Sequence, residues 1–183
     1  MARSKKPATT GDMIRSLLVI LVPVVLILWF FSRDLGDYPV QQVDYQPVLA
    51  QARQEAPYPV LAPEGLPNSW RATQVTWVAE GQPHLNDQAS VRNLWQLGFL
   101  DPSDIFISVN QGDRQPEQFV EDISRDGLVD GKSLIGDESW VRYVSPDERT
   151  RSLVRATPEV TTVVVGDTGY EALEAFAGTL SAS

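Results

Sequence analysis

The sequence contains no cysteine, and among its 183 residues there is a single histidine, His84. The lack of cysteine excludes disulfides, thiol nucleophiles and lipidation of a cysteine. One histidine without any cysteine is too few side chains for a zinc site, which takes three or four such ligands. We therefore expect no bound metal and no cofactor. The folded part must be stable through its hydrophobic core alone, which is ordinary for a domain of about 120 residues.

The chain also lacks the motifs and the basic surface of proteins that bind nucleotides or nucleic acids. It has neither a G-x-x-x-x-G-K-[ST] phosphate loop nor a G-x-G-x-x-G dinucleotide loop. From Pro57 onward, nine Lys and Arg residues stand against nineteen Asp and Glu residues, a net charge of -10. Such a domain repels phosphate backbones. Nucleotides and nucleic acids are therefore not expected as partners.

One long stretch lacks charge altogether. Leu17 to Phe31 (LLVILVPVVLILWFF) contains no polar or charged side chain. At 1.5 Å per residue, a helix over residues 13–32 is about 30 Å long, which matches the hydrocarbon core of a bilayer. We expect residues 13–32 to be a transmembrane signal anchor in contact with lipid. A cleaved signal peptide is the alternative, but no small-x-small cleavage site follows the apolar run.

The charges that flank the apolar run predict its orientation. Residues 1–16 carry four cations against one anion, a net charge of +3, and cationic segments stay on the cytoplasmic side. We expect a cytoplasmic basic tail over residues 1–12 and the anchor over 13–32. A juxtamembrane linker with a short helix would occupy residues 33–56, and an extracytoplasmic domain residues 57–183. The predicted location is the cell (plasma) membrane, as a single-pass protein.

The outer domain has the alternating and helical patterns of an α+β fold. Period-two alternation of apolar residues predicts strands at 70–79, 91–100, 104–110, 138–144, 151–157 and 160–166, the last two as a hairpin. Turn dipeptides such as Asp130-Gly131 leave residues 132–135 as at most a brief strand. Residues 116–124 predict a short amphipathic helix that begins with proline.

The C-terminal segment predicts a second helix. Thr168-x-x-Glu171 fits a capping box, and five side chains then form one apolar face: Tyr170, Leu173, Phe176, Ala177 and Leu180. We expect a twisted antiparallel sheet of about six strands, covered mainly on one face by this helix.

Several segments resemble a known family. They are PEGLPNSWRAT (63–73), Trp95-x-x-Gly98-Phe99, Trp140-x-x-Tyr143 and the terminal TVVVGDTGYEALEAFAGTL. Together with the apolar run, they resemble the domain-of-unknown-function 4245 family of actinobacterial single-span proteins over nearly the whole chain after residue 13. The resemblance implies a cell-envelope protein with a fold like the Mog1/PsbP group, and it assigns no catalytic residue.

Two kinds of side chain are candidates for catalysis, and neither forms a recognisable motif. His84 lies in a polar loop, near Ser90, Asp87 and Asp101 in sequence only. Paired acids such as Asp101 with Asp104, or Asp147 with Glu148, are what a glycoside hydrolase would need. A solvated histidine and a solvated acidic surface are the favoured interpretations of these residues, because no nucleophile motif or D-x-D-x-D-G loop is present. We expect no catalytic residue and no enzymatic activity.

Four tryptophans outside the apolar run are the candidate ligand-binding residues: Trp70, Trp77, Trp95 and Trp140. An indole offers a flat apolar face with one polar N–H group. These rings either line a groove for a lipid or a glycan, or they fill the core between sheet and helix.

The leading hypothesis from the sequence is a non-enzymatic, membrane-anchored binding or accessory module that contacts another envelope protein or membrane complex. The alternatives are binding of a small lipid or glycan in an aromatic pocket and, with less support, hydrolysis by paired carboxylates.

Overall fold

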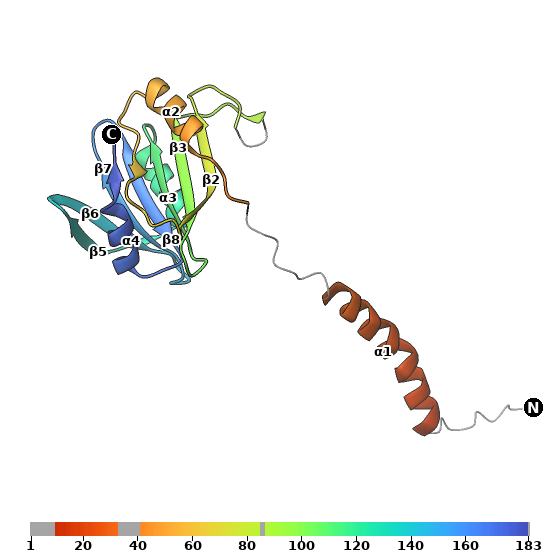
Figure 1. The fold of residues 1–183 in the computed structure, drawn as a ribbon. Helices are drawn as coiled ribbons and strands as arrows, with labels where there is room; N and C mark the ends of the chain where they lie inside the picture. Colours follow the sequence, from red (N-terminus) through yellow and green to blue (C-terminus); the bar gives the residue numbers. More distant parts are fainter. Residues whose placement is uncertain (1–9, 33–40, 85–86, 183) are drawn as a thin grey trace, which may run out of the picture. The chain divides into compact units, whose positions relative to one another are not determined.

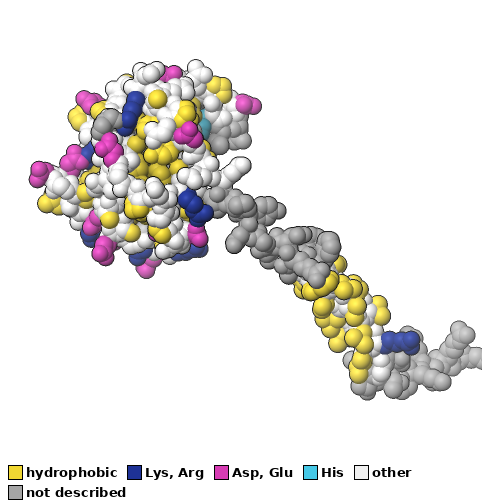
Figure 2. Space-filling view, viewed as in Figure 1, with side chains coloured by type: hydrophobic (Ala, Val, Ile, Leu, Met, Phe, Trp, Pro, Cys, Tyr) yellow, Lys and Arg dark blue, Asp and Glu magenta, His cyan; other side chains and the backbone are white. Residues whose placement is uncertain are grey.

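The computed structural model describes residues 10–32, 41–84 and 87–182 and divides the chain into two units, Met1–Val40 and Gln41–Ser183. In the first unit, helix α1 (Thr10–Ser32) includes Pro23. The apolar side chains described along it are exposed, and Figure 2 shows them on the visible side of the helix. Among the residues whose side chains are described, no helix is both long enough and apolar enough to cross a membrane. Residues 1–9 and 33–40, which belong to the expected tail and linker, lie outside the described residues.

The second unit is an α+β fold built on a seven-stranded antiparallel sheet (Figure 1). The strand order is β2-β3-β4-β8-β7-β6-β5. The strands are β2 (Arg71–Val78), β3 (Leu94–Leu100), β4 (Phe106–Gly112), β5 (Leu128–Ile135), β6 (Glu138–Val144), β7 (Arg151–Ala156) and β8 (Thr161–Gly166). The helices are α2 (Gln46–Glu55), α3 (Pro116–Ser124) and α4 (Tyr170–Ala177). Two short strands, β1 (Ala62–Pro63) and β9 (Leu180–Ser181), pair with each other.

Much of this agrees with the sequence pattern. The α+β class, helix 116–124, strand 138–144 and the β7–β8 hairpin are confirmed. Helix α2, the short helix expected within residues 33–56, packs against β2 and belongs to the second unit, so these residues are not merely a spacer. Val91 was expected in the apolar phase of its strand, but β3 begins at Leu94 and Val91 is 54 % exposed.

Helices cover both faces of the sheet, not mainly one. Alternate strand residues point to opposite faces, so Leu153 and Val164 join α2 and α4 in the larger core, while Val154 and Val163 join α3 in a smaller one. Phe119 of α3 is buried in that second core. The sequence located α3 but did not indicate that it covers the second face of the sheet, because a nine-residue helix buries few side chains.

The sheet has seven strands, one more than expected, because the dipeptide that was taken for a turn lies inside a strand. Asp130-Gly131 predicts a turn, but in β5 it forms a bulge, where the register against β6 shifts between Val129 and Lys132. Gly131 adopts φ +102°, which glycine tolerates. The strand therefore continues through the dipeptide from Leu128 to Ile135.

The C-terminal helix is shorter than predicted and is not closed by a capping box. Its N-cap is Gly169 and not Thr168, and no side chain caps the first turn. Leu173, Phe176 and Ala177 are buried as expected. Leu180 is not on the helix; it pairs with Pro63 in the β1–β9 sheet.

The proline-rich segment before β2 is fixed to the sheet by a buried glutamine. Gln111 accepts a hydrogen bond from the Leu61 backbone (2.8 Å) and donates one to the Pro59 carbonyl (3.1 Å). Tyr58 is buried beside it and donates to the carbonyl of Asn93 (3.1 Å). This burial raises the pKa of the Tyr58 hydroxyl. These bonds hold residues 58–63 against the larger core.

Candidate functional site

Two of the four candidate tryptophans are sealed in the core. Trp95 on β3 has no exposed surface, and its indole N–H donates to the Leu61 carbonyl at 2.9 Å. Trp140 on β6 is 2 % exposed, and the guanidinium of Arg155 lies over its ring at 5.1 Å. Both rings therefore belong to the core, and for Trp95 the apolar phase on its strand had suggested this.

Trp77 on β2 is half-buried, and its polar group is already used. Its indole N–H donates to Glu55 at the end of α2 (2.7 Å), and its ring packs edge-on against Tyr58. The contact ties α2 to the sheet. It leaves the Trp77 N–H without capacity for a ligand.

Trp70 is the only one of the four that lines the largest cavity found in the described residues. We call this cavity, of about 700 Å³, the aromatic hollow. Its lining comes from the segment before α2, the segment before β2, and strands β2 and β3: Gln42, Val43, Asp44, Tyr45, Pro63, Gly65, Leu66, Pro67, Asn68, Trp70, Ala72 and Phe99.

The aromatic hollow has an apolar floor and a polar rim. Phe99 and Ala72 are buried at the floor, while Gln42, Asp44 and Asn68 are exposed around the opening. Packing fixes the rings, because Tyr45 meets Phe99 edge-on at 5.5 Å. Trp70 stacks on Phe176 of α4 at 5.6 Å. The aromatic walls are therefore formed before any ligand arrives.

Polar groups around the hollow lack protein partners. Within the described residues, the indole N–H of Trp70, the hydroxyl of Tyr45 and the side-chain amides of Gln42 and Asn68 form no hydrogen bond. Asp44 uses one carboxylate oxygen to accept from the Gln46 backbone (3.1 Å). Unused donors and acceptors beside aromatic walls are what a small-molecule site requires.

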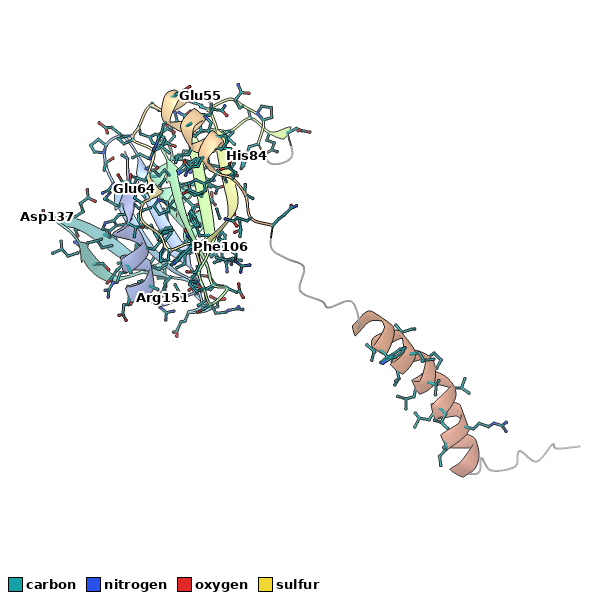
Figure 3. The ribbon with its side chains drawn as sticks, in the orientation of Figure 1. Glu55, Glu64, His84, Phe106, Asp137 and Arg151 are labelled. Atoms are coloured by element: carbon teal, nitrogen blue, oxygen red, sulfur yellow. The ribbon has the colours of Figure 1, made fainter. Side chains whose placement is uncertain are left out.

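A second surface feature is the free edge of the sheet at β5. This strand is last in the strand order and pairs only with β6. Leu128, Val129 and Leu134 on it are exposed, and Leu134 reaches 75 %. In Figure 3, Asp137 marks the tip of the β5–β6 hairpin, which projects from the sheet. Exposed apolar side chains on an edge strand, whose outer side has no partner strand, are a site for strand addition.

The structure does not assemble His84 into a catalytic group. Ser90 also lines the 630 Å³ cavity beside His84, but its hydroxyl donates to the Arg92 carbonyl at 2.6 Å. The His84 ring forms no hydrogen bond to any described residue. General base catalysis needs the base within hydrogen-bond reach of the nucleophile, which is not the case for this pair.

Several of the paired carboxylates have structural partners. Asp101 accepts from the backbones of Ser103 and Ile105 in a tight turn, and Asp104 pairs with Arg71. The hydroxyl of Ser145 donates to Asp147 and lowers the pKa of that carboxyl. Across the described residues, no three Asp, Glu or His side chains come close enough together to hold a metal ion.

Sequence reasoning missed some residues of the two surface features. Tyr45 and Gln42 were assigned to a linker, and Leu134 was assigned to a brief strand between turns. Only the packing of α2 could have indicated Tyr45. The sequence pattern placed Leu134 among apolar strand residues, but it did not indicate that this side chain is exposed.

No curated protein matches the chain. The family described as "Protein of unknown function (DUF4245)" matches residues 5–180, which is almost the entire sequence. The chain therefore belongs to the DUF4245 family.

Proposed function

We propose that the chain is a non-enzymatic accessory module of the cell envelope, anchored in the plasma membrane by residues 13–32, and that its outer domain docks another envelope protein at the β5 edge. The edge strand β5, with its outer side unpaired and with exposed apolar side chains, is the observation that carries the proposal. The family description names no activity, so the argument rests on this chain's own residues.

Support for the anchor comes from the sequence. The fifteen residues from Leu17 to Phe31 lack any charge, and Arg15 stands near their cytoplasmic end. A long arginine side chain at that depth reaches the lipid headgroups. Trp29 is near the opposite end, where aromatic rings favour the interface. The basic tail then stays in the cytoplasm and the domain lies outside.

The proposed topology has a direct test. A reporter that is active only outside the cytoplasm, fused after Ser183, should be active, and the same reporter fused before Met1 should be silent. Mature protein should also retain residues 13–32 when its N-terminus is sequenced. The reverse reporter pattern, or loss of those residues, would refute the anchor and the location together.

The β5 edge indicates the chemistry of its partner. Unpaired backbone groups of the strand can form a ladder with an extended segment, and Leu134 and Val129 lie beside that ladder to meet apolar side chains. Asp126, Asp130 and Asp137 lie on or next to the strand against one cation, Lys132. We propose that the occupant is an extended segment of another protein, with alternating apolar residues and flanking Lys or Arg.

The same charges disfavour a second copy of the chain. Each domain carries a net charge of -10 from Pro57 onward, so two β5 edges would bring like charges together. The bulge at Asp130-Gly131 also interrupts the strand, as bulges do at edges protected from open-ended pairing. A short basic strand from a different protein avoids the charge repulsion, and it can pair with the part of β5 on one side of the bulge.

The experiment places a photo-crosslinking amino acid at Leu134 in the full chain, in its native membranes. Val91 gives a matched control, since it is an exposed aliphatic residue outside any strand. We expect one discrete adduct from Leu134 and none from Val91. Mass spectrometry of the adduct should locate the crosslink in an extended, Lys- or Arg-flanked segment of an envelope protein.

Three outcomes would reject the docking proposal. They are absence of an adduct at Leu134, equal adducts at Leu134 and Val91, and a Leu134 adduct with a second copy of the chain. Leu134→Lys should abolish the adduct formed by the same crosslinker at Val129, because a cation on this face repels a basic partner.

A further inference from the structure

We propose that the aromatic hollow binds a pyranose ring of a neutral glycan, a site separate from the β5 edge. A sugar ring has an apolar face made of C–H groups and a rim of hydroxyls. The hollow offers the complement, with aromatic walls inside and free hydrogen-bonding groups at its opening. Its volume of about 700 Å³ lies within the usual range of small-molecule sites.

Trp70 is the central residue of the proposal. The N–H groups of Trp77 and Trp95 are bonded to Glu55 and Leu61, and Trp140 is 2 % exposed. The N–H of Trp140 also has no partner among the described residues, and Trp140 borders a cavity of about 380 Å³, but its ring is almost fully buried. Trp70 is the half-buried ring of the four whose N–H no described residue accepts. Its stacking on Phe176 fixes the ring, so little side-chain entropy is lost when a ligand packs against it.

The rim distinguishes a sugar from an acyl chain. Gln42 and Asn68 place free amides at the opening, and each amide can both donate and accept a hydrogen bond. Tyr45 adds a free hydroxyl, which also acts in both directions. An acyl chain would leave these groups without partners, whereas sugar hydroxyls match them.

Charge distinguishes neutral sugars from phosphorylated or acidic ones. Among the described residues, Asp44 is the only carboxylate that lines the hollow, and no Lys or Arg lines it. The whole domain is strongly acidic. An anionic sugar would enter without a cation to pair with it. A neutral sugar can use the second oxygen of Asp44 as an acceptor for its hydroxyls.

The test uses the full chain in a detergent without a sugar headgroup, because glycoside detergents would occupy the site. The probes are the neutral methyl glycosides of glucose, mannose and galactose, with N-acetylglucosamine. Glucose 6-phosphate and decanoate serve as anionic and apolar controls. Saturation-transfer NMR detects binding, and titration gives Kd. We expect at least one neutral sugar to bind and neither control to displace it.

Variants assign the binding to the hollow. Trp70→Ala should weaken binding about tenfold or more, and Trp70→Phe by less, because the ring stays while the N–H is lost. Asn68→Ala and Tyr45→Phe change rim groups without emptying the core and should each weaken binding about threefold to tenfold. Trp77→Phe is the matched control and should leave Kd unchanged.

No binding by any neutral sugar, displacement by decanoate, or unchanged Kd in both Trp70→Phe and Asn68→Ala would overturn the proposal. Comparing the methyl glycoside with its octyl counterpart separates two sources of the same ring. Equal Kd values assign a free glycan, and a tighter octyl glycoside assigns a glycolipid headgroup. Neither outcome depends on whether a partner docks at β5.

Discussion

Gly98 and Phe106 form a close cross-strand pair whose energetics can be predicted in sign as well as size. Gly98 is buried on β3, and a Cβ added there would lie 2.4 Å from Cζ of Phe106. Phe106 begins the neighbouring strand β4 and is 39 % exposed, and its ring occupies the space that a Cβ on Gly98 would enter. An aromatic ring over a strand glycine shields backbone that would otherwise face water.

The alanine substitution at Gly98 has two opposing effects. Overpacking against Phe106 costs about 1–3 kcal/mol. Replacing a strand glycine by alanine returns about 0.5–1 kcal/mol of backbone entropy. Gly98→Ala should therefore lower the free energy of unfolding by up to about 2.5 kcal/mol. In a Phe106→Ala background the clash is absent, so Gly98→Ala should raise the free energy of unfolding by about 0.5–1 kcal/mol.

Urea unfolding of the four proteins of this double-mutant cycle, followed by tryptophan fluorescence in micelles, measures the coupling. Gly166→Ala is a control, because its Cβ would meet the backbone oxygen of Phe106 at 2.9 Å. That contact survives Phe106→Ala, so Gly166→Ala should destabilise both backgrounds. If Gly98→Ala is equally destabilising with and without the Phe106 ring, the explanation of this glycine is wrong.

Two further predictions concern α4. Gly169→Ser should raise the free energy of unfolding, measured by urea titration, by about 0.5–1 kcal/mol. The N-cap has no side-chain hydrogen bond, and a Cβ added at Gly169 would meet no atom within 4 Å. A loss of stability would contradict this reasoning. Burial, followed by the hydrogen bond to Asp130, raises the pKa of Tyr170 to about 12. The neutral phenol is thus favoured in the folded state, so its contribution is full below pH 10 and is lost as pH rises toward 12. Tyr170→Phe should be less stable by about 1 kcal/mol at neutral pH, and its stability should fall less than that of wild type between pH 10 and 12; parallel pH curves would contradict this.

The sequence determined the elements whose signals are local. Period-two alternation located β6 and the β7–β8 hairpin, and the proline at the start of residues 116–124 marked α3. These patterns are readable because an element must turn its apolar side chains to one side wherever it packs. The α+β class follows from them directly.

Signals that serve more than one structure were misread. Asp130-Gly131 suits a turn and a bulge equally, and only pairing with β6 selected the bulge. Thr168-x-x-Glu171 suits a capping box, yet the helix begins one residue later, at a position fixed by the packing of Leu173. In both places, tertiary contacts decided between local options of similar energy.

Only the tertiary structure decided what each tryptophan does and where a surface remains open. Trp70 and Trp95 both lie in sequence typical of strands. Trp95 is covered by the chain around Leu61, whereas Trp70 borders the aromatic hollow, to which Tyr45 and Phe99 contribute from other segments. Exposure depends on which distant segments lie over a side chain. Leu134 is exposed for the same reason, because β5 is the last strand of the sheet and no other described segment lies over this side chain. The order of strands in a sheet is set by the topology, which no local sequence pattern encodes.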